Sequence, residues 1–151
     1  MLISAVMSRP VISVAPATSV RQAAMLMKHH AIGALPVTTG RRIVGIVTDR
    51  DIVTRILTKR SWTGDHPVAD AMSPDPFTCL ADQTVAEAAV LMGDAQIRRV
   101  PLVARSGDLV GILSIGDIAE NVSEDLAGEA LGEISEERCR KVWAARLRLR
   151  E

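Results

Sequence analysis

The sequence is poor in aromatic side chains, because Phe77, Trp62 and Trp143 are the full set and tyrosine is absent. Extensive stacking of bases on aromatic rings, the usual platform for single-stranded nucleic acid, is therefore excluded. A pocket for a nucleobase would have to be lined mainly by aliphatic side chains.

Net charge is also lacking, since 18 basic and 18 acidic residues balance. A neutral chain offers no bulk electrostatic attraction to nucleic acid or to an anionic membrane. In addition, no apolar run approaches the ~18–20 residues that a membrane-spanning helix requires. We therefore expect neither a nucleic-acid partner nor a membrane.

Cysteine is scarce too, and the two residues, Cys79 and Cys139, show no metal-ligand spacing. This usage favours a reducing, cytoplasmic compartment, with Cys79 as a buried thiol in an apolar run. His29 and His30 have no partner at a metal-binding spacing, so no metal site is expected. No nucleophile–base set, P-loop or glycine-rich dinucleotide motif is present, so we do not expect an enzyme.

The dominant positive feature is an internal repeat, in which the segment from Met7 to Ile52 recurs from Met72 to Ile118. A unit this short cannot bury a full core alone, so we expect the two copies to pack on each other as a pseudo-twofold pair with two similar clefts. The matched positions, first copy before second, are Val20 and Val85, Ala23 and Ala88, Ala24 and Ala89, Leu26 and Leu91, Met27 and Met92, Ile32 and Ile97, Pro36 and Pro101, and Gly45 and Gly111.

Each copy is predicted to fold as strand, helix, strand, strand, helix, which makes the chain an α/β (α+β) protein. Capping-box spacing begins the first helix of each copy, at Ser19 with Gln22 and at Thr84 with Glu87. The predicted strands are Val11–Val14, Ile32–Val37 and Ile43–Val47 in the first copy, and Phe77–Leu80, Ile97–Val103 and Leu109–Leu113 in the second; the second helices begin at Thr48 and Ser114.

The repeat gives four predicted segments: 1–60 and 71–122 for the two copies, 61–70 for a linker, and 123–151 for a C-terminal helical extension. Ser135 followed by two glutamates indicates a helix start. Cys139, Val142, Trp143 and Leu147 would share one face of this helix, which would dock on its own body or on a partner chain.

The strongest candidate site is a motif at the last strand-to-helix junction of each copy, where a hydroxyl residue precedes an aspartate by three positions: Thr48 with Asp51, and Ser114 with Asp117. One interpretation is structural, since such a pair caps a helix by satisfying its free N–H groups. The other is functional, since a helix start can accept a phosphate and an aspartate can accept hydrogen bonds from ribose hydroxyls. The local spacing allows both.

The paired repeats, their Leu-Pro-Val and Val-Pro-Leu strands at Pro36 and Pro101, and the two Gly-x-x-Thr/Ser-x-x-Asp endings resemble tandem CBS domains, a Bateman module. The resemblance covers about Leu2 to Val122 and is closest to small stand-alone two-CBS proteins of the bacterial hypoxic-response type. It implies a non-enzymatic regulatory module that binds an adenosine-containing ligand in the clefts between the repeats. AMP is the first candidate, with ADP, ATP, NADH and S-adenosylmethionine as others, and no cofactor is required.

The resemblance also implies roles for individual residues. Asp51 and Asp117 would bind ribose hydroxyls, and Thr48 and Ser114 would lie near phosphate. The remaining implied contacts are Ile32, Ala34 and Ile97 with adenine, Ser13 and Thr78 with base or phosphate, and Arg98 and Arg99 with phosphate, unless these arginines form surface ion pairs instead.

CBS modules commonly pair through their helices, so a homodimer is expected, together with an effector protein that is not part of this chain. An alternative function stays open at this point. The clefts would remain empty in that case, and the protein would be an interaction or dimerisation scaffold acting through its C-terminal helix.

Overall fold

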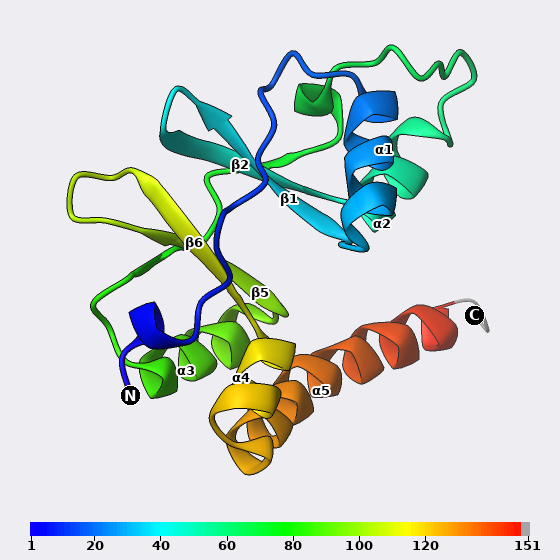
Figure 1. Cartoon of the computed structure of the whole chain (residues 1–151). Coiled ribbons are helices and arrows are strands. Elements are labelled where there is room, and N and C mark those ends of the chain that lie inside the picture. Colours follow the sequence, from blue (N-terminus) through cyan, green and yellow to red (C-terminus); the bar gives the residue numbers. More distant parts are fainter. Residues whose placement is uncertain (149–151) are drawn as a thin grey trace. The chain divides into compact units, whose positions relative to one another are not determined.

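The computed structural model describes the backbone of residues 1–148 and the side chains of residues 1–136. The chain folds into two compact units, each with its own sheet and helices (Figure 1). We name them by the repeat that supplies most of their residues. The first-repeat unit contains Val11–Pro76 and Arg105–Leu109, and the second-repeat unit contains Met1–Pro10, Phe77–Ala104 and the chain from Val110 onward.

The sheet of the first-repeat unit has β2 at its centre, with β1 and β3 antiparallel on either side. Val14 extends the sheet beyond β1 through one parallel bridge to Val37. The elements of this unit are α1 (Val20–His30), β1 (Ala34–Thr39), β2 (Arg42–Thr48), α2 (Asp49–Asp51), a π-helix η2 (Ile52–Ile56), a 3₁₀ helix η3 (Val68–Asp70) and β3 (Ser73–Pro74).

The second-repeat unit also has a three-stranded sheet, but its central strand is the counterpart of β1 rather than of β2. Here β5 is central, β4 runs parallel to it, and β6 is its other neighbour. Ser8 forms an antiparallel bridge with Ile112 on the outer side of β6. The elements are a 3₁₀ helix η1 (Ile3–Ala5), β4 (Cys79–Leu80), α3 (Val85–Ala95), β5 (Arg99–Val103), β6 (Leu109–Ser114), α4 (Ile115–Asn121) and α5 (Glu124–Arg148).

The capping boxes predicted for the first helices are both formed. Ser19 Oγ accepts a hydrogen bond from Gln22 N at 3.2 Å, and Ser19 N donates to Gln22 Oε1 at 3.3 Å. In α3 the same two bonds join Thr84 and Glu87, at 3.2 and 2.7 Å. The local sequence therefore fixes where α1 and α3 begin.

Each unit completes its core with a segment that precedes the opposite copy in the sequence. Ile3 and Met7 are buried in the core of the second-repeat unit, together with residues of α3, β5 and β6. Val68 and Ala71 are buried in the core of the first-repeat unit. Neither contiguous copy therefore supplies its whole core, as the small size of the repeat suggested.

The predicted first strand of each copy is only partly formed. In the predicted first strands Val11–Val14 and Phe77–Leu80, only Val14 and Cys79–Leu80 pair with a neighbouring strand. Each run has one buried side chain, Val14 in the first and Cys79 in the second, and the residues before these two are irregular.

The C-terminal helix is present but begins at Glu124 rather than at Ser135. Ser123 Oγ accepts a hydrogen bond from Leu126 N at 3.2 Å and so satisfies a free N–H group of the first turn. Ala127, Ala130 and Ile134 are buried in the same core as α3 and α4. The predicted apolar face with Cys139, Val142, Trp143 and Leu147 lies outside the residues whose side chains are described.

Candidate functional site

The junction of the first-repeat unit brings together the end of β2 and the start of β1. Thr48 lies opposite Ala34 in the sheet, and Asp49 N donates to Gly33 O at 3.0 Å. Thr48 N donates to Asp51 Oδ2 at 2.9 Å, while Asp51 N donates to Thr48 Oγ1 at 3.1 Å. Four predicted site residues thus lie at one end of this sheet: Ile32, Ala34, Thr48 and Asp51.

The junction of the second-repeat unit has the same geometry. Ser114 N donates to Asp117 Oδ2 at 2.7 Å, and Asp117 N donates to Ser114 Oγ at 3.1 Å. Ser114 Oγ also donates to Asp117 Oδ2 at 2.8 Å. Ile115 N donates to Arg98 O at 3.0 Å, which brings Ile97, Arg98 and Arg99 beside Ser114 and Asp117.

The structural interpretation of the motif is therefore correct, because both hydroxyl–aspartate pairs form reciprocal capping boxes. Capping engages only one carboxylate oxygen of each aspartate. The second oxygen of Asp51, Oδ1, lies 3.8 Å from Arg55 Nη2. Oδ1 of Asp117 accepts a hydrogen bond from Ser8 Oγ at 3.3 Å. Oδ1 of each aspartate is therefore not used by the cap.

The charges around the two junctions differ. Arg98 and Arg99 are exposed, and neither forms an ion pair with any residue that the structure describes. The first-repeat unit has Gly33 and Ala34 at these positions, and the Asp49 carboxylate lies over Gly33, since a Cβ there would be 3.1 Å from Asp49 Oδ2. The second-repeat junction therefore has two exposed arginines at the start of its central strand, whereas the arginines of the first-repeat junction, Arg50 and Arg55, follow β2.

Two predicted site residues lie toward the other end of their sheets. Ser13 Oγ accepts a hydrogen bond from Thr38 Oγ1 at 3.4 Å. Thr38 follows Ala34 by four residues in β1, which corresponds to about 13 Å along a strand. Ser13 also lines an open groove of about 630 Å³ along α1. Thr78 directly precedes β4, whose Cys79 pairs with Leu102 near the far end of β5. Within one unit, neither residue lies with the hydroxyl–aspartate pair.

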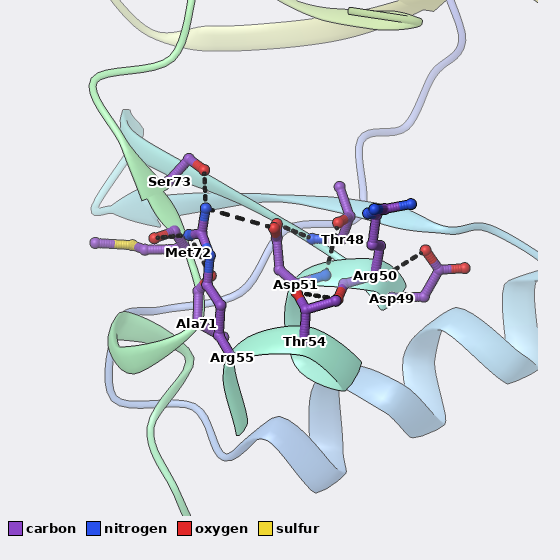
Figure 2. A network of polar contacts seen from close by, with 9 residues as sticks. All are labelled: Thr48, Asp49, Arg50, Asp51, Thr54, Arg55, Ala71, Met72 and Ser73. Carbon is purple, nitrogen blue, oxygen red and sulfur yellow. Dashed lines mark hydrogen bonds and ion pairs between the residues drawn. The ribbon is translucent and has the colours of Figure 1, made fainter. Parts of the chain in front are cut away.

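Sequence reasoning missed two side chains that contact the aspartates. Arg55, which follows Asp51 by four residues, is drawn with its contacts in Figure 2. An aspartate and an arginine at this spacing are a known helical pair, so a signal was present. For Ser8 there was none, because 109 residues separate it from Asp117.

Among the described residues, no three His, Cys, Asp or Glu side chains come together in a way that would hold a metal ion. The described helices also include none that is both long and apolar enough to cross a membrane.

The fold and the junctions define an α/β module of two tandem repeats, each carrying one aspartate-capped strand-to-helix junction. The chain belongs to the CBS domain family, whose model matches residues 3–58 and 68–124. The CBS domain-containing protein YhcV of Bacillus subtilis is 39% identical over 130 residues, which are 85% of this chain and 91% of YhcV.

Solved structures agree with this assignment. Hypoxic Response Protein I, solved with two coordinated zinc ions, aligns with a TM-score of 0.73 and 29% identity over 81% of this chain and 99% of its own. CBSX2 in complex with AMP aligns with a TM-score of 0.71 and 25% identity over 80% and 94%. The CBS domain pair of MJ0100, in complex with 5-methylthioadenosine and S-adenosyl-L-methionine, gives a TM-score of 0.71 and 26% identity over 80% and 94%. The predicted resemblance to stand-alone two-CBS proteins is confirmed.

Proposed function

We propose that this protein is a non-enzymatic regulatory module that binds an adenosine-containing ligand, with AMP as the first candidate. The observation that carries the proposal is the pair of aspartates, Asp51 and Asp117, each with its Oδ1 left over by the capping box. The complexes of CBSX2 with AMP and of MJ0100 with two adenosine derivatives support the class of ligand.

In this proposal the two carboxylates accept hydrogen bonds from ribose hydroxyls. Thr48 and Ser114 lie near phosphate, and the half-buried or buried aliphatic residues Ile32, Ala34 and Ile97 contact adenine. Ser13 and Thr78 remain predicted contacts with base or phosphate.

We further propose that phosphate-bearing ligands prefer the second-repeat junction. Arg98 and Arg99 supply planar guanidinium groups that suit phosphate oxygens. The Asp49 carboxylate of the first-repeat junction would repel a phosphate beside Gly33, and its counterpart in the second repeat is the uncharged Ile115. Arg55 of the first-repeat junction is already engaged by Ala71, Met72 and Ser73.

The proposed working unit is a cytoplasmic homodimer that passes its signal to another protein. Exposed apolar side chains support a helical dimer surface: Met25, Leu57 and Trp62 line an open groove of about 400 Å³ in the first-repeat unit. Contiguous exposed apolar surface of this kind typically marks an interaction site. Sedimentation of the wild-type protein beside Leu57→Asp would test it, since a monomeric wild type would contradict the dimer.

The experiment that tests ligand binding is thermal unfolding with AMP, ADP, ATP, NADH and S-adenosylmethionine, for the wild type and for Asp51→Ala and Asp117→Ala. A ligand at about 100 times its Kd should stabilise the native state by roughly 2.7 kcal/mol. A shift that one aspartate variant abolishes would support the proposal. Absence of any shift with all five ligands would contradict it and favour the scaffold alternative.

Matched controls separate binding from helix capping, because each aspartate variant also loses a cap worth about 0.5–2 kcal/mol. Gln22→Ala removes the corresponding capping-box residue of α1 in the first-repeat unit, and Glu87→Ala does so for α3 in the second-repeat unit. Both controls should unfold earlier than the wild type and still respond to ligand.

A further inference from the structure

Arg55 joins the candidate ligand site of the first-repeat unit to the segment Ala71–Ser73 (Figure 2). Its Nη1 donates to Ala71 O at 2.9 Å and to Met72 O at 3.1 Å. Its Nη2 donates to Ser73 Oγ at 3.3 Å and lies 3.8 Å from Asp51 Oδ1. The guanidinium is therefore held in place by three acceptors while one edge faces the aspartate.

The backbone that carries Arg55 is unusual. Residues Ile52–Ile56 form a π-helix, closed by a hydrogen bond from Leu57 N to Ile52 O at 3.2 Å. Single π-helical turns occur frequently at functional sites, because the wider turn redirects a side chain. The second repeat continues its junction as an ordinary α-helix, Ile115–Asn121.

The distance between Arg55 and Asp51 is too long for a direct hydrogen bond and short enough for a bridged one. A hydroxyl oxygen at about 2.8 Å from Asp51 Oδ1 and about 2.9 Å from Arg55 Nη2 spans the 3.8 Å gap without moving either atom. Such a hydroxyl would donate to the carboxylate and accept from the guanidinium. Both bonds are charge-assisted and hence strong.

We propose that Arg55 is a second ribose-binding residue of the first-repeat junction, where it donates to the sugar hydroxyl that Asp51 accepts from. The inference rests on the proposed function, because it takes the ligand of Asp51 to be a ribose. Asp51 and Arg55 would together bind the 2′- or 3′-hydroxyl, and the hydrogen bonds of Arg55 to Ala71, Met72 and Ser73 would hold its guanidinium in position.

The second-repeat junction lacks this arrangement. Asn121 stands four residues after Asp117 and donates from Nδ2 to Asp117 O at 3.0 Å. Asp117 Oδ1 accepts from Ser8 Oγ instead. The pair of an aspartate and an arginine four residues apart is therefore specific to the first repeat.

The test measures the affinities of AMP, 2′-deoxy-AMP and 3′-deoxy-AMP by titration calorimetry, in an Asp117→Ala background that isolates the first-repeat junction. With Arg55 present, one deoxy analogue should bind about a hundredfold more weakly than AMP, because the missing hydroxyl forms two charge-assisted hydrogen bonds, one with Asp51 and one with Arg55. Arg55→Gln should weaken AMP about tenfold and leave that analogue nearly unchanged, so that the ratio of the two Kd values falls to about ten, the part that the bond to Asp51 contributes. Arg55→Lys should retain part of the ratio, since lysine keeps the charge but lacks the planar fork.

Several outcomes would overturn the inference. If Arg55→Gln weakens AMP and both analogues equally, Arg55 only supports the fold; if it weakens none, Arg55 does not contact ligand. If the wild type binds AMP and Asp117→Ala abolishes all binding, the first-repeat junction is not a ribose site, although the proposed function stands. If the wild type binds none of the adenosine ligands, the proposed function fails and the inference fails with it.

Discussion

Ser8 Oγ donates a hydrogen bond to Asp117 Oδ1 over 3.3 Å, although 109 residues separate the two along the chain. The bond is one of several that hold the N-terminal segment in the second-repeat unit. Ser8 N also donates to Ile112 O at 3.0 Å, and Ile3 N donates to Gln83 O at 3.0 Å. The N-terminal segment is thus part of the unit that contains Asp117, and it reaches the candidate ligand carboxylate itself.

The burial of Ile3 gives the first prediction. Its side chain is fully buried in the core of the second-repeat unit. We expect Ile3→Ala to lower the free energy of unfolding by about 2–5 kcal/mol, because the substitution leaves a cavity. Urea denaturation measures the loss, and hydrogen exchange should locate the weakened protection in the second-repeat unit. Leu2→Ala is the control, since Leu2 is half exposed; equal losses for the two variants would contradict the assignment.

Two glycines in matching positions give a second prediction. A Cβ at Gly45 would lie 2.6 Å from Met72 Sδ and 3.0 Å from the backbone oxygen of Ser73 in β3. The three atoms nearest to a Cβ at Gly111 all belong to side chains, those of Met7 and Leu102. Side chains can rotate away and a paired strand cannot, so Gly45→Ala should destabilise by about 1–3 kcal/mol and Gly111→Ala by less.

Urea unfolding of both glycine variants checks this order, and the reverse order would contradict it. Gly128→Ala in α5 serves as the control, because no described atom outside its chain neighbours and the nearby backbone of its own helix lies within 4 Å of its Cβ position. Alanine favours a helix over glycine, so this variant should be more stable by about 0.5–1 kcal/mol.

Much of the fold could be predicted because its signals are local. The capping boxes at Ser19 and Thr84 define the starts of α1 and α3 within a few residues of sequence. The late start predicted for α5 was wrong for the opposite reason. Gly128 and Gly132 lower helix propensity in this stretch, and what stabilises it is the burial of Ala127 and Ala130 with α3 and α4.

The candidate site was predictable to a similar degree. The hydroxyl–aspartate pairs and the residues beside them follow from the repeat, since matched positions take matched places in the two sheets. The side chains that contact Oδ1 of the two aspartates, Ser8 and Arg55, could not be predicted from the repeat. Ser8 reaches Asp117 through tertiary structure alone, and the direction of Arg55 depends on a π-helical turn that the sequence does not indicate.

Acid should reveal the contribution of Glu87 to stability. Hydrogen bonds from the Thr84 backbone and then from its hydroxyl lower the pKa of Glu87 below its ordinary value of 4.5. The folded state thus favours the carboxylate, so this stabilisation is present above pH 4.5 and is lost as the pH falls through the folded pKa. We expect Glu87→Gln to unfold earlier than the wild type at pH ~6, and the gap between the two to narrow as the pH falls below 4.5. Melting curves across this range measure the difference, and a gap independent of pH would contradict the prediction.

Cys79 should be an unreactive thiol in the folded protein. Its side chain is 3% exposed in the core of the second-repeat unit. Burial raises the pKa of the thiol, and the negative charge of Glu87 raises it further. Alkylation requires the thiolate and access to it, and both are suppressed here.

The measurement is the rate of iodoacetamide labelling in a Cys139→Ser variant, which leaves Cys79 as the single cysteine. Labelling at pH ~8 should be slow in buffer and rapid in denaturant, because unfolding restores both the ordinary pKa and access. Adding Glu87→Gln should change the native rate little, since burial is the larger of the two causes. Rapid labelling of the folded protein would show that the core around Cys79 opens readily, and a large effect of Glu87→Gln would show that charge outweighs burial.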